Sequence, residues 1–185
     1  MDAFEQVMAG LLSRNGYWVS QGYKVELTKE EKKKVNRPTT PRWELDLVAY
    51  SGASEELLVV ECKSYIDSVG VRASDIVSGD ETNSRYKLFV DSVLRNTVMA
   101  RLKEQLHGAG FIGEAAELSL GLAVGKFRNA SDEAELSSYF EDQGWRLFTP
   151  TWMVSQLKEK SEESYFDSVD HIVSKLIYRN LGGSE

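Results

Sequence analysis

The sequence predicts an α/β fold, and three features of its hydrophobic pattern predict it. Two neighbouring segments, Arg42–Tyr50 and Leu57–Ser64, have the patterns of β-strands. Segments with helical periodicity lie on both sides of them, and another strand-like segment follows the second helical one. With 185 residues, the chain is long enough for one domain with a substantial core, and we treat residues 1–185 as a single unit.

The first element is a helix over Ala3–Asn15, because its apolar residues recur at the spacing of one helix face: Phe4, Val7, Met8, Leu11 and Leu12. Asp2 is a suitable N-cap, and Glu5 stands where it completes a capping box. Residues 17–28 alternate as a strand that we expect to be interrupted near Gln21 and Gly22. Residues 29–41 mix Lys and Glu with Pro and Thr, and we expect a loop there.

A hairpin follows. The segment Arg42–Tyr50 begins by alternating polar and apolar residues, whereas Leu57–Val60 is a short apolar run typical of a buried strand. The polar residues 51–56 suit the connection between them. If the hairpin is symmetric about the bond between residues 53 and 54, Asp46 lies opposite Glu61.

In the same register Glu44 lies opposite Lys63, and all four side chains share one face. Two adjacent carboxylates repel each other unless a shared proton, a nearby cation or a bound metal offsets the repulsion. Oxygen ligands of this kind suit Mg²⁺ or Mn²⁺. The alternative is structural: a cross-strand ion pair between Glu44 and Lys63, with Asp46 solvated.

The remaining segments complete the α/β pattern. Residues 65–84 form a polar connection that is either a substrate loop or a mobile surface loop. We expect one long helix over residues 85–108, a strand over 118–127, a helix over 130–140, a strand over 145–148 and a helix over 149–160. A last helix, from near Ser164 to Arg179, carries a wide apolar face that we expect in the core, with a dimer interface as the alternative. His171 lies off that face and is expected on the surface.

Composition and charge limit the function classes. The single cysteine, Cys62, excludes an internal disulfide and fits a cytoplasmic protein, and we expect it to serve packing. The N-terminus lacks the pattern of a signal peptide, and no apolar run reaches the length of a membrane span. The net charge of −7 argues against a strong, sequence-independent grip on DNA, so a basic patch, a second copy or a partner protein must supply nucleic-acid affinity.

The segment from Pro41 to Asp46, followed after fourteen residues by Glu61-Cys62-Lys63, resembles the signature of the PD-(D/E)xK nuclease superfamily, which has the restriction-endonuclease-like fold. Unlike in many members, the proline does not directly precede the aspartate. The resemblance implies an αβββαβ core over residues 3–127, a mixed central sheet flanked by helices, with a strand and helices of residues 128–185 as an extension.

The resemblance also implies a metal-dependent nuclease acting most readily on DNA. Asp46, Glu61 and the backbone carbonyl of Cys62 would hold Mg²⁺ or Mn²⁺, and Lys63 would orient or activate a water. Many members place a glutamate of the first helix near the metal, and Glu5 is the matching residue here. A non-catalytic subunit of the same fold, serving as a protein-interaction or nucleic-acid-binding scaffold, is the alternative that the acidic charge favours.

Basic residues cluster just before the hairpin, between residues 29 and 42. Lys34, Arg37 and Arg42 are the candidates for contacts with phosphate, and Arg42 is the first choice because it shares the predicted face of Asp46. The alternative is a solvated loop without a binding role.

Overall fold

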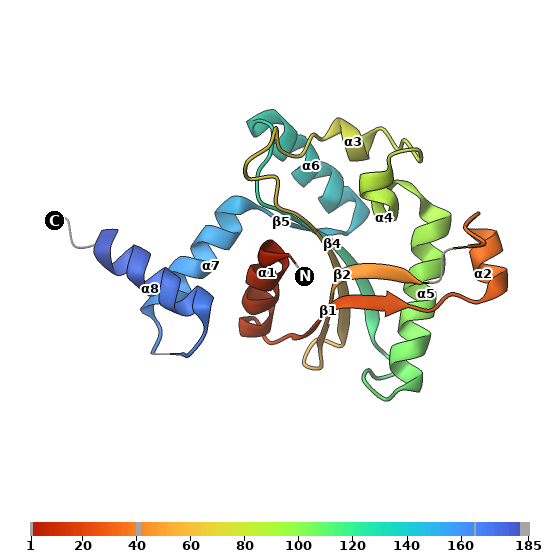
Figure 1. The fold of residues 1–185 in the computed structure, drawn as a ribbon, viewed down its shortest axis with the longest axis horizontal. Helices are drawn as coiled ribbons and strands as arrows, with labels where there is room; N and C mark the ends of the chain where they lie inside the picture. Colours follow the sequence, from red (N-terminus) through yellow and green to blue (C-terminus); the bar gives the residue numbers. More distant parts are fainter. Residues whose placement is uncertain (1, 40–41, 165, 182–185) are drawn as a thin grey trace.

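A computed structural model describes residues 2–39, 42–164 and 166–181. Within these ranges one sheet has the order β1-β2-β3-β4-β5 (Figure 1). Its strands are β1 Trp18–Val25, β2 Trp43–Ser51, β3 Glu56–Lys63, β4 Glu117–Val124 and β5 Arg146–Phe148. The first three strands pair antiparallel, whereas β3, β4 and β5 pair parallel. The predicted α/β class is therefore confirmed, with a mixed five-stranded sheet.

Helices cover both faces of this sheet (Figure 1). On one face, α1 Ala3–Arg14 and α7 Pro150–Glu162 enclose a buried cluster that includes Met8, Leu12, Leu58, Val60 and Met153. On the other, α5 Ser92–Gly108 and α6 Ala130–Gln143 pack over a larger cluster that includes Val59, Leu94, Val98, Leu122 and Phe140. The short elements α3 Ser74–Val77, η1 Ser84–Tyr86 and α4 Lys87–Val90 lie on the same side.

The predicted hairpin register is confirmed where β2 and β3 pair. The ladder runs from Ser51 opposite Glu56 to Leu47 opposite Val60, with residues 52–55 as the turn. Leu57 to Val60 are completely buried, as expected for a strand covered on both faces. After Glu56 at its start, the strand carries polar side chains again only at its other end, where Glu61 follows.

The expected loop at residues 29–41 is wrong in its first half, which forms α2 Lys29–Lys34. Thr28 and Glu31 make a capping box: the Glu31 amide donates to the Thr28 hydroxyl at 3.2 Å, and the Thr28 amide donates to the Glu31 carboxylate at 2.7 Å. Lys and Glu are good helix formers, so a capped start is enough for a short helix. Thr40 and Pro41 lie outside the described residues.

The single long helix expected over residues 85–108 is also wrong. Asp91 ends α4 and serves as N-cap of α5, where its carboxylate accepts from the Leu94 amide at 2.8 Å. The connection over residues 65–84 contains α3 and places Val71, Ala73 and Ile76 in the core. This middle part of the connection is therefore held by burial rather than lying on the surface.

The expectations that the last helix turns its apolar face into the core and leaves His171 on the surface are wrong as well. Helix α8, Val169–Leu181, packs against α7, yet its large apolar side chains are exposed. His171, expected on the surface, is completely buried. None of the helices in the described ranges combines the length and the apolar character needed to cross a membrane.

Candidate functional site

Three ionisable side chains meet where β2 and β3 separate. The Lys63 ammonium lies 3.5 Å from a carboxylate oxygen of Glu61 and 4.0 Å from one of Asp46. The three side chains are largely withdrawn from water, with 17% of Lys63, 16% of Glu61 and 26% of Asp46 exposed. The convergence expected from the hairpin register is therefore present for these three residues.

At this point a side chain, instead of a backbone carbonyl, accepts the hydrogen bond of a β3 amide. Beyond the pair of Leu47 and Val60, the Cys62 amide donates to the Asp46 carboxylate at 2.7 Å. This bond satisfies an amide that the end of the ladder would otherwise leave without a partner. It also holds the Asp46 carboxylate against the backbone of β3.

At the same level, the side chains of β1 and β2 reverse the face of the sheet to which they point. Leu45 packs into the cluster under α5, whereas Leu47 packs into the cluster under α1, although two residues of a regular strand share a face. In β1 the same reversal occurs across Gly22, which lies opposite Asp46 and has φ +60°. The strand expected to be interrupted at this glycine is instead continuous, and the glycine absorbs the reversal.

The electrostatics of the site centre on Glu61. Burial, followed by the negative charge of Asp46, raises the pKa of Glu61 to about 7, while Lys63 acts in the opposite direction and Glu5 adds to the rise. Burial and the same carboxylates raise the pKa of the Cys62 thiol far above its usual value. The thiol therefore stays protonated, which agrees with the packing role expected for it.

A hollow of about 230 Å³ adjoins these residues. Its lining consists of Glu5, Gln21, Gly22, Glu44 and Asp46. The side-chain oxygen of Gln21 is buried and has no hydrogen-bond partner. Gln21 was not predicted as a site residue, although its place beside the glycine that interrupts the strand pattern was a usable signal. An unpaired buried oxygen is costly, so a donor or a cation in the hollow would be stabilised.

Glu5 caps helix α1 and also lies beside the site. Its carboxylate accepts from the Asp2 amide at 3.4 Å, which completes the predicted capping box of α1. It also lines the hollow beside Asp46 and repels negative charge on Glu61. A helix cap and a side chain directed to the site are thus compatible.

Other predicted residues do not join the three. Glu44 lines the hollow but is 63% exposed, and its carboxylate lies 3.8 Å from Lys24 rather than at Lys63, so the structural ion pair considered above is wrong. The Arg42 guanidinium pairs with Glu26 at 2.9 Å and does not line the hollow, because it precedes β2.

The two other basic candidates lie near the end of α2. Arg37 places its guanidinium over the ring of Trp43, 5.1 Å from the ring centre, and Lys34 is exposed in the last turn of the helix. They form a basic surface beside the hairpin but make no contact with Asp46, Glu61 or Lys63 that would place them in the site.

The donor set suits a hard divalent cation. Asp46 and Glu61 present carboxylate oxygens, and Gln21, whose side-chain oxygen is buried and unpaired, is among the residues that line the adjoining hollow. Over the described ranges, no three side chains of the types His, Cys, Asp and Glu are grouped to hold a metal. Mg²⁺ typically takes one or two carboxylates together with water, and Asp46 and Glu61 are the two carboxylates closest to Lys63.

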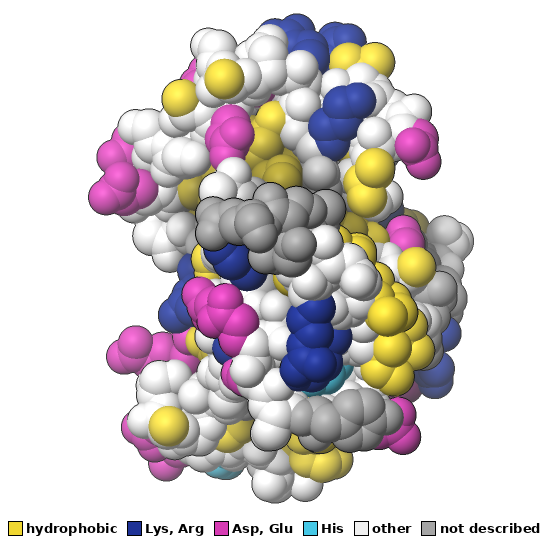
Figure 2. All heavy atoms as spheres, turned by 90° about the vertical axis from the view of Figure 1, so that its left-hand side faces the viewer, with side chains coloured by type: hydrophobic (Ala, Val, Ile, Leu, Met, Phe, Trp, Pro, Cys, Tyr) yellow, Lys and Arg dark blue, Asp and Glu magenta, His cyan; other side chains and the backbone are white. Residues whose placement is uncertain are grey.

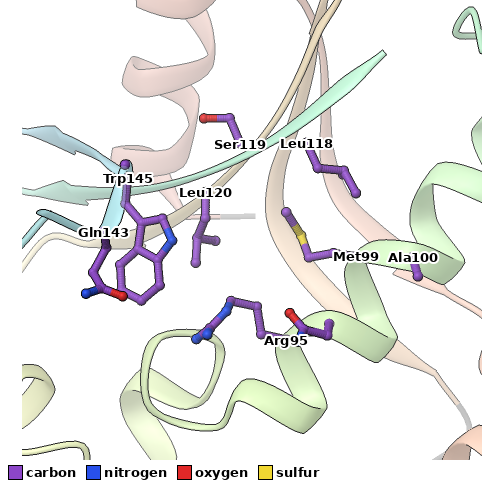
Figure 3. Close-up of a pocket in the computed structure, with 10 residues that line it drawn as sticks. Arg95, Met99, Ala100, Leu118, Ser119, Leu120, Gln143 and Trp145 are labelled. Carbon is purple, nitrogen blue, oxygen red and sulfur yellow. The ribbon is translucent and has the colours of Figure 1, made fainter. Parts of the chain in front are cut away.

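Larger hollows lie elsewhere. A hollow of about 420 Å³ lies between α1, the end of α7 and the start of α8, and two others lie along the sheet. One, of about 530 Å³, begins directly after Lys63 and runs between residues 64–68 and the start of α1. The other, of about 320 Å³, lies between α5, β4 and the start of β5, and there Arg95 stacks 4.9 Å from the ring centre of Trp145 (Figure 3). The hollow at Trp145 contains none of the predicted site residues, whereas the one after Lys63 adjoins them.

The chain was compared with protein-family models, with curated proteins and with solved structures, and none of the three comparisons gave a match. The site geometry and the sequence pattern are therefore the two sources from which a function can be argued.

Proposed function

We propose that this protein is a metal-dependent nuclease that hydrolyses phosphodiester bonds, with DNA as the preferred substrate. The proposal is carried by one observation: Lys63 lies within 4.0 Å of both Asp46 and Glu61 at a buried hairpin end. The order helix, three antiparallel strands, helix and parallel strand over residues 3–124 is compatible with a restriction-endonuclease-like core.

In this proposal each residue has a distinct role. Asp46, Glu61 and the carbonyl oxygen of Cys62 would hold Mg²⁺ or Mn²⁺, with Glu5 completing the set directly or through water. The ion, when bound, would supply a Lewis acid for the phosphate. The raised pKa of Glu61, about 7 without a cation, supports this assignment, because a neighbouring positive charge is what would keep that buried carboxylate ionised.

Lys63 would orient the attacking water and stabilise negative charge on the phosphate. The water oxygen bonds to phosphorus while the bond to the leaving oxygen breaks, and the leaving oxygen takes up a proton. One product then ends in a phosphate and the other in a hydroxyl. The hollow between residues 64–68 and α1 offers Phe4, Tyr65 and Ile66 beside this position, and such surfaces suit stacking of bases.

The experiment compares cleavage of labelled duplex, single-stranded and branched DNA and of RNA, with and without Mn²⁺. Wild-type protein should cleave in the presence of Mn²⁺, and Asp46→Ala or Lys63→Ala should each lower the rate by about 10²-fold or more. Lys24→Ala is the matched control, because it removes the same ammonium from a solvent-exposed pair with Glu44.

Thermal unfolding of each variant shows whether the fold is kept. Undiminished cleavage by a purified, folded Asp46→Ala or Lys63→Ala variant would contradict the assignment. Wild-type protein that binds nucleic acid but leaves it intact with Mn²⁺ would favour the scaffold instead.

A further inference from the structure

Helix α8 has its polar side toward the protein and its apolar side toward solvent. His171 and Ser174, one turn apart, are buried. The large side chains on and just before the helix are 38–79% exposed: Phe166, Val169, Ile172, Val173, Leu176 and Ile177. We call these six residues the α8 face. This sidedness is the reverse of that expected for a helix at the surface of a monomer.

Polar contacts set the rotation of α8. Lys160 of α7 forms an ion pair with Asp170 in which 7% of the lysine side chain is exposed. Lys175 donates to the carbonyl oxygens of Ser161, at 3.1 Å, and of Glu163. Turning the α8 face inward would carry Asp170 away and leave the buried Lys160 ammonium without its partner, which is unfavourable.

Helix α1 contributes to the same arrangement. A Cβ atom added to Gly10 would lie 3.0 Å from a carboxylate oxygen of Asp170, so the start of α8 sits close against α1. The polar side of α8 therefore faces α7 and α1, although both ring nitrogens of His171 lack a hydrogen-bond partner there, and the apolar side faces solvent.

The size of the α8 face agrees with a contact between two copies. From the exposed fractions, these six side chains present on the order of 600 Å², so pairing two such faces would bury on the order of 1,200 Å², the lower end of specific interfaces. Figure 2, which turns α7 and α8 toward the viewer, shows hydrophobic side chains gathered beside Lys and Arg side chains on this side of the molecule.

The helix dipole is compatible with a second copy as the partner. Asp170, in the first turn of α8, is paired with Lys160 on the side turned toward the protein and is not part of the α8 face. Two α8 helices paired antiparallel about a twofold axis would set their dipoles in opposite directions, which is the favourable arrangement. In such an isologous contact, both copies use the same surface, the α8 face.

We propose that the α8 face is the contact surface with a second copy of this chain, paired antiparallel with Val173 next to the twofold axis. The proposal is independent of the nuclease assignment, since none of its residues lines the candidate site. Sedimentation or light scattering of the wild-type protein should give a dimer at micromolar concentration.

Val173→Asp should shift this equilibrium to monomers by at least tenfold in the dissociation constant, because it buries two carboxylates side by side at the axis. Val93→Asp is the matched control: it is the same substitution on a helix, α5, at nearly the same exposure, 47% against 45%. This control should leave the dimer unchanged.

A cysteine variant tests the same contact with a smaller risk of misfolding. Oxidised Val173→Cys should form a covalent dimer, whereas Val93→Cys should not, and Cys62 stays partly buried in both. Wild-type protein that is monomeric at high micromolar concentration would overturn the proposal. So would a dimer that Val173→Asp leaves intact and Val173→Cys does not cross-link.

Discussion

The carboxyl group of Glu61 has a strongly perturbed pKa. It is buried beside Asp46 and near Glu5, and Lys63 offsets only part of their combined charge. A group whose pKa is raised from 4.5 to about 7 keeps a proton in the folded state that the unfolded chain releases. The folded protein therefore gains stability from this site at low pH and loses it as the pH rises.

We predict that this contribution is complete below pH about 4.5 and is lost as the pH rises through about 7. The loss is at most about 3 kcal/mol, given the size of the shift. Urea unfolding of the metal-free protein in EDTA, at several pH values, measures it. Glu61→Gln should flatten this part of the profile, because an amide does not titrate.

Glu30→Gln, a change of the same type at an exposed position of α2, is the control and should leave the profile unchanged. Saturating Mn²⁺ should reduce the loss in wild type and have little effect in Glu61→Gln. Equal pH profiles for wild type and Glu61→Gln would show that the Glu61 carboxyl is not perturbed.

At the scale of elements, the site lies where the side chains of β1 and β2 reverse the face of the sheet to which they point. Gly22 of β1 makes this possible, because its φ of +60° is costly for residues with a side chain. An added Cβ would meet only a Glu44 oxygen at 3.5 Å, an ordinary contact, so space is not the constraint. The requirement for glycine is conformational.

We predict that Gly22→Ala lowers the free energy of unfolding by about 1–2 kcal/mol. It should also weaken Mn²⁺ binding, measured by calorimetry, because Gln21 and Asp46 are held on either side of the reversal. Gly52→Ala, in the turn of the β2–β3 hairpin, is the control: its φ is not positive, and its Cβ would meet Tyr50 at 4.0 Å. Equal stability of the two variants would contradict this account of β1.

At the scale of the whole molecule, charge decides how nucleic acid could be held. The chain carries a net charge of −7, so a basic surface must act locally. In the described ranges such a surface lies at the end of α2, where three lysines occupy the last turn. Arg42 is engaged with Glu26 and Arg37 with Trp43, which leaves the lysines as the more available cations there.

We predict that Lys34→Gln weakens binding of a labelled duplex and makes the plot of log K against log salt less steep by about 0.9. Fluorescence anisotropy in EDTA, between low and physiological salt, gives both quantities. Lys158→Gln is the control, because it removes the same charge from an exposed position on α7, a different helix. Identical slopes for the two variants would remove α2 from the binding surface.

Local patterns sufficed for much of this structure. The hairpin register followed from an apolar strand, a short polar loop and the twofold period of strands. Asp46, Glu61 and Lys63 meet just beyond the last pair of that ladder. The capping box of α1 was equally readable. The capping box at Thr28 and Glu31 had the same local signal, so the helix α2 was predictable although the lysine-rich composition suggested a loop.

Other features required the tertiary structure. Gln21 gains its unpaired oxygen only because β1 lies beside β2 and reverses there, and Glu44 turns to Lys24 because that residue lies across the antiparallel pair. The amino-acid sequence by itself determined the α/β class and the register of the β2–β3 hairpin, since both follow from short-range periodicity. The rotation of α8 was decided only in the folded chain, because the contacts that hold it, the ion pair of Asp170 with Lys160 and the bonds of Lys175 to the end of α7, join elements that the sequence pattern does not connect.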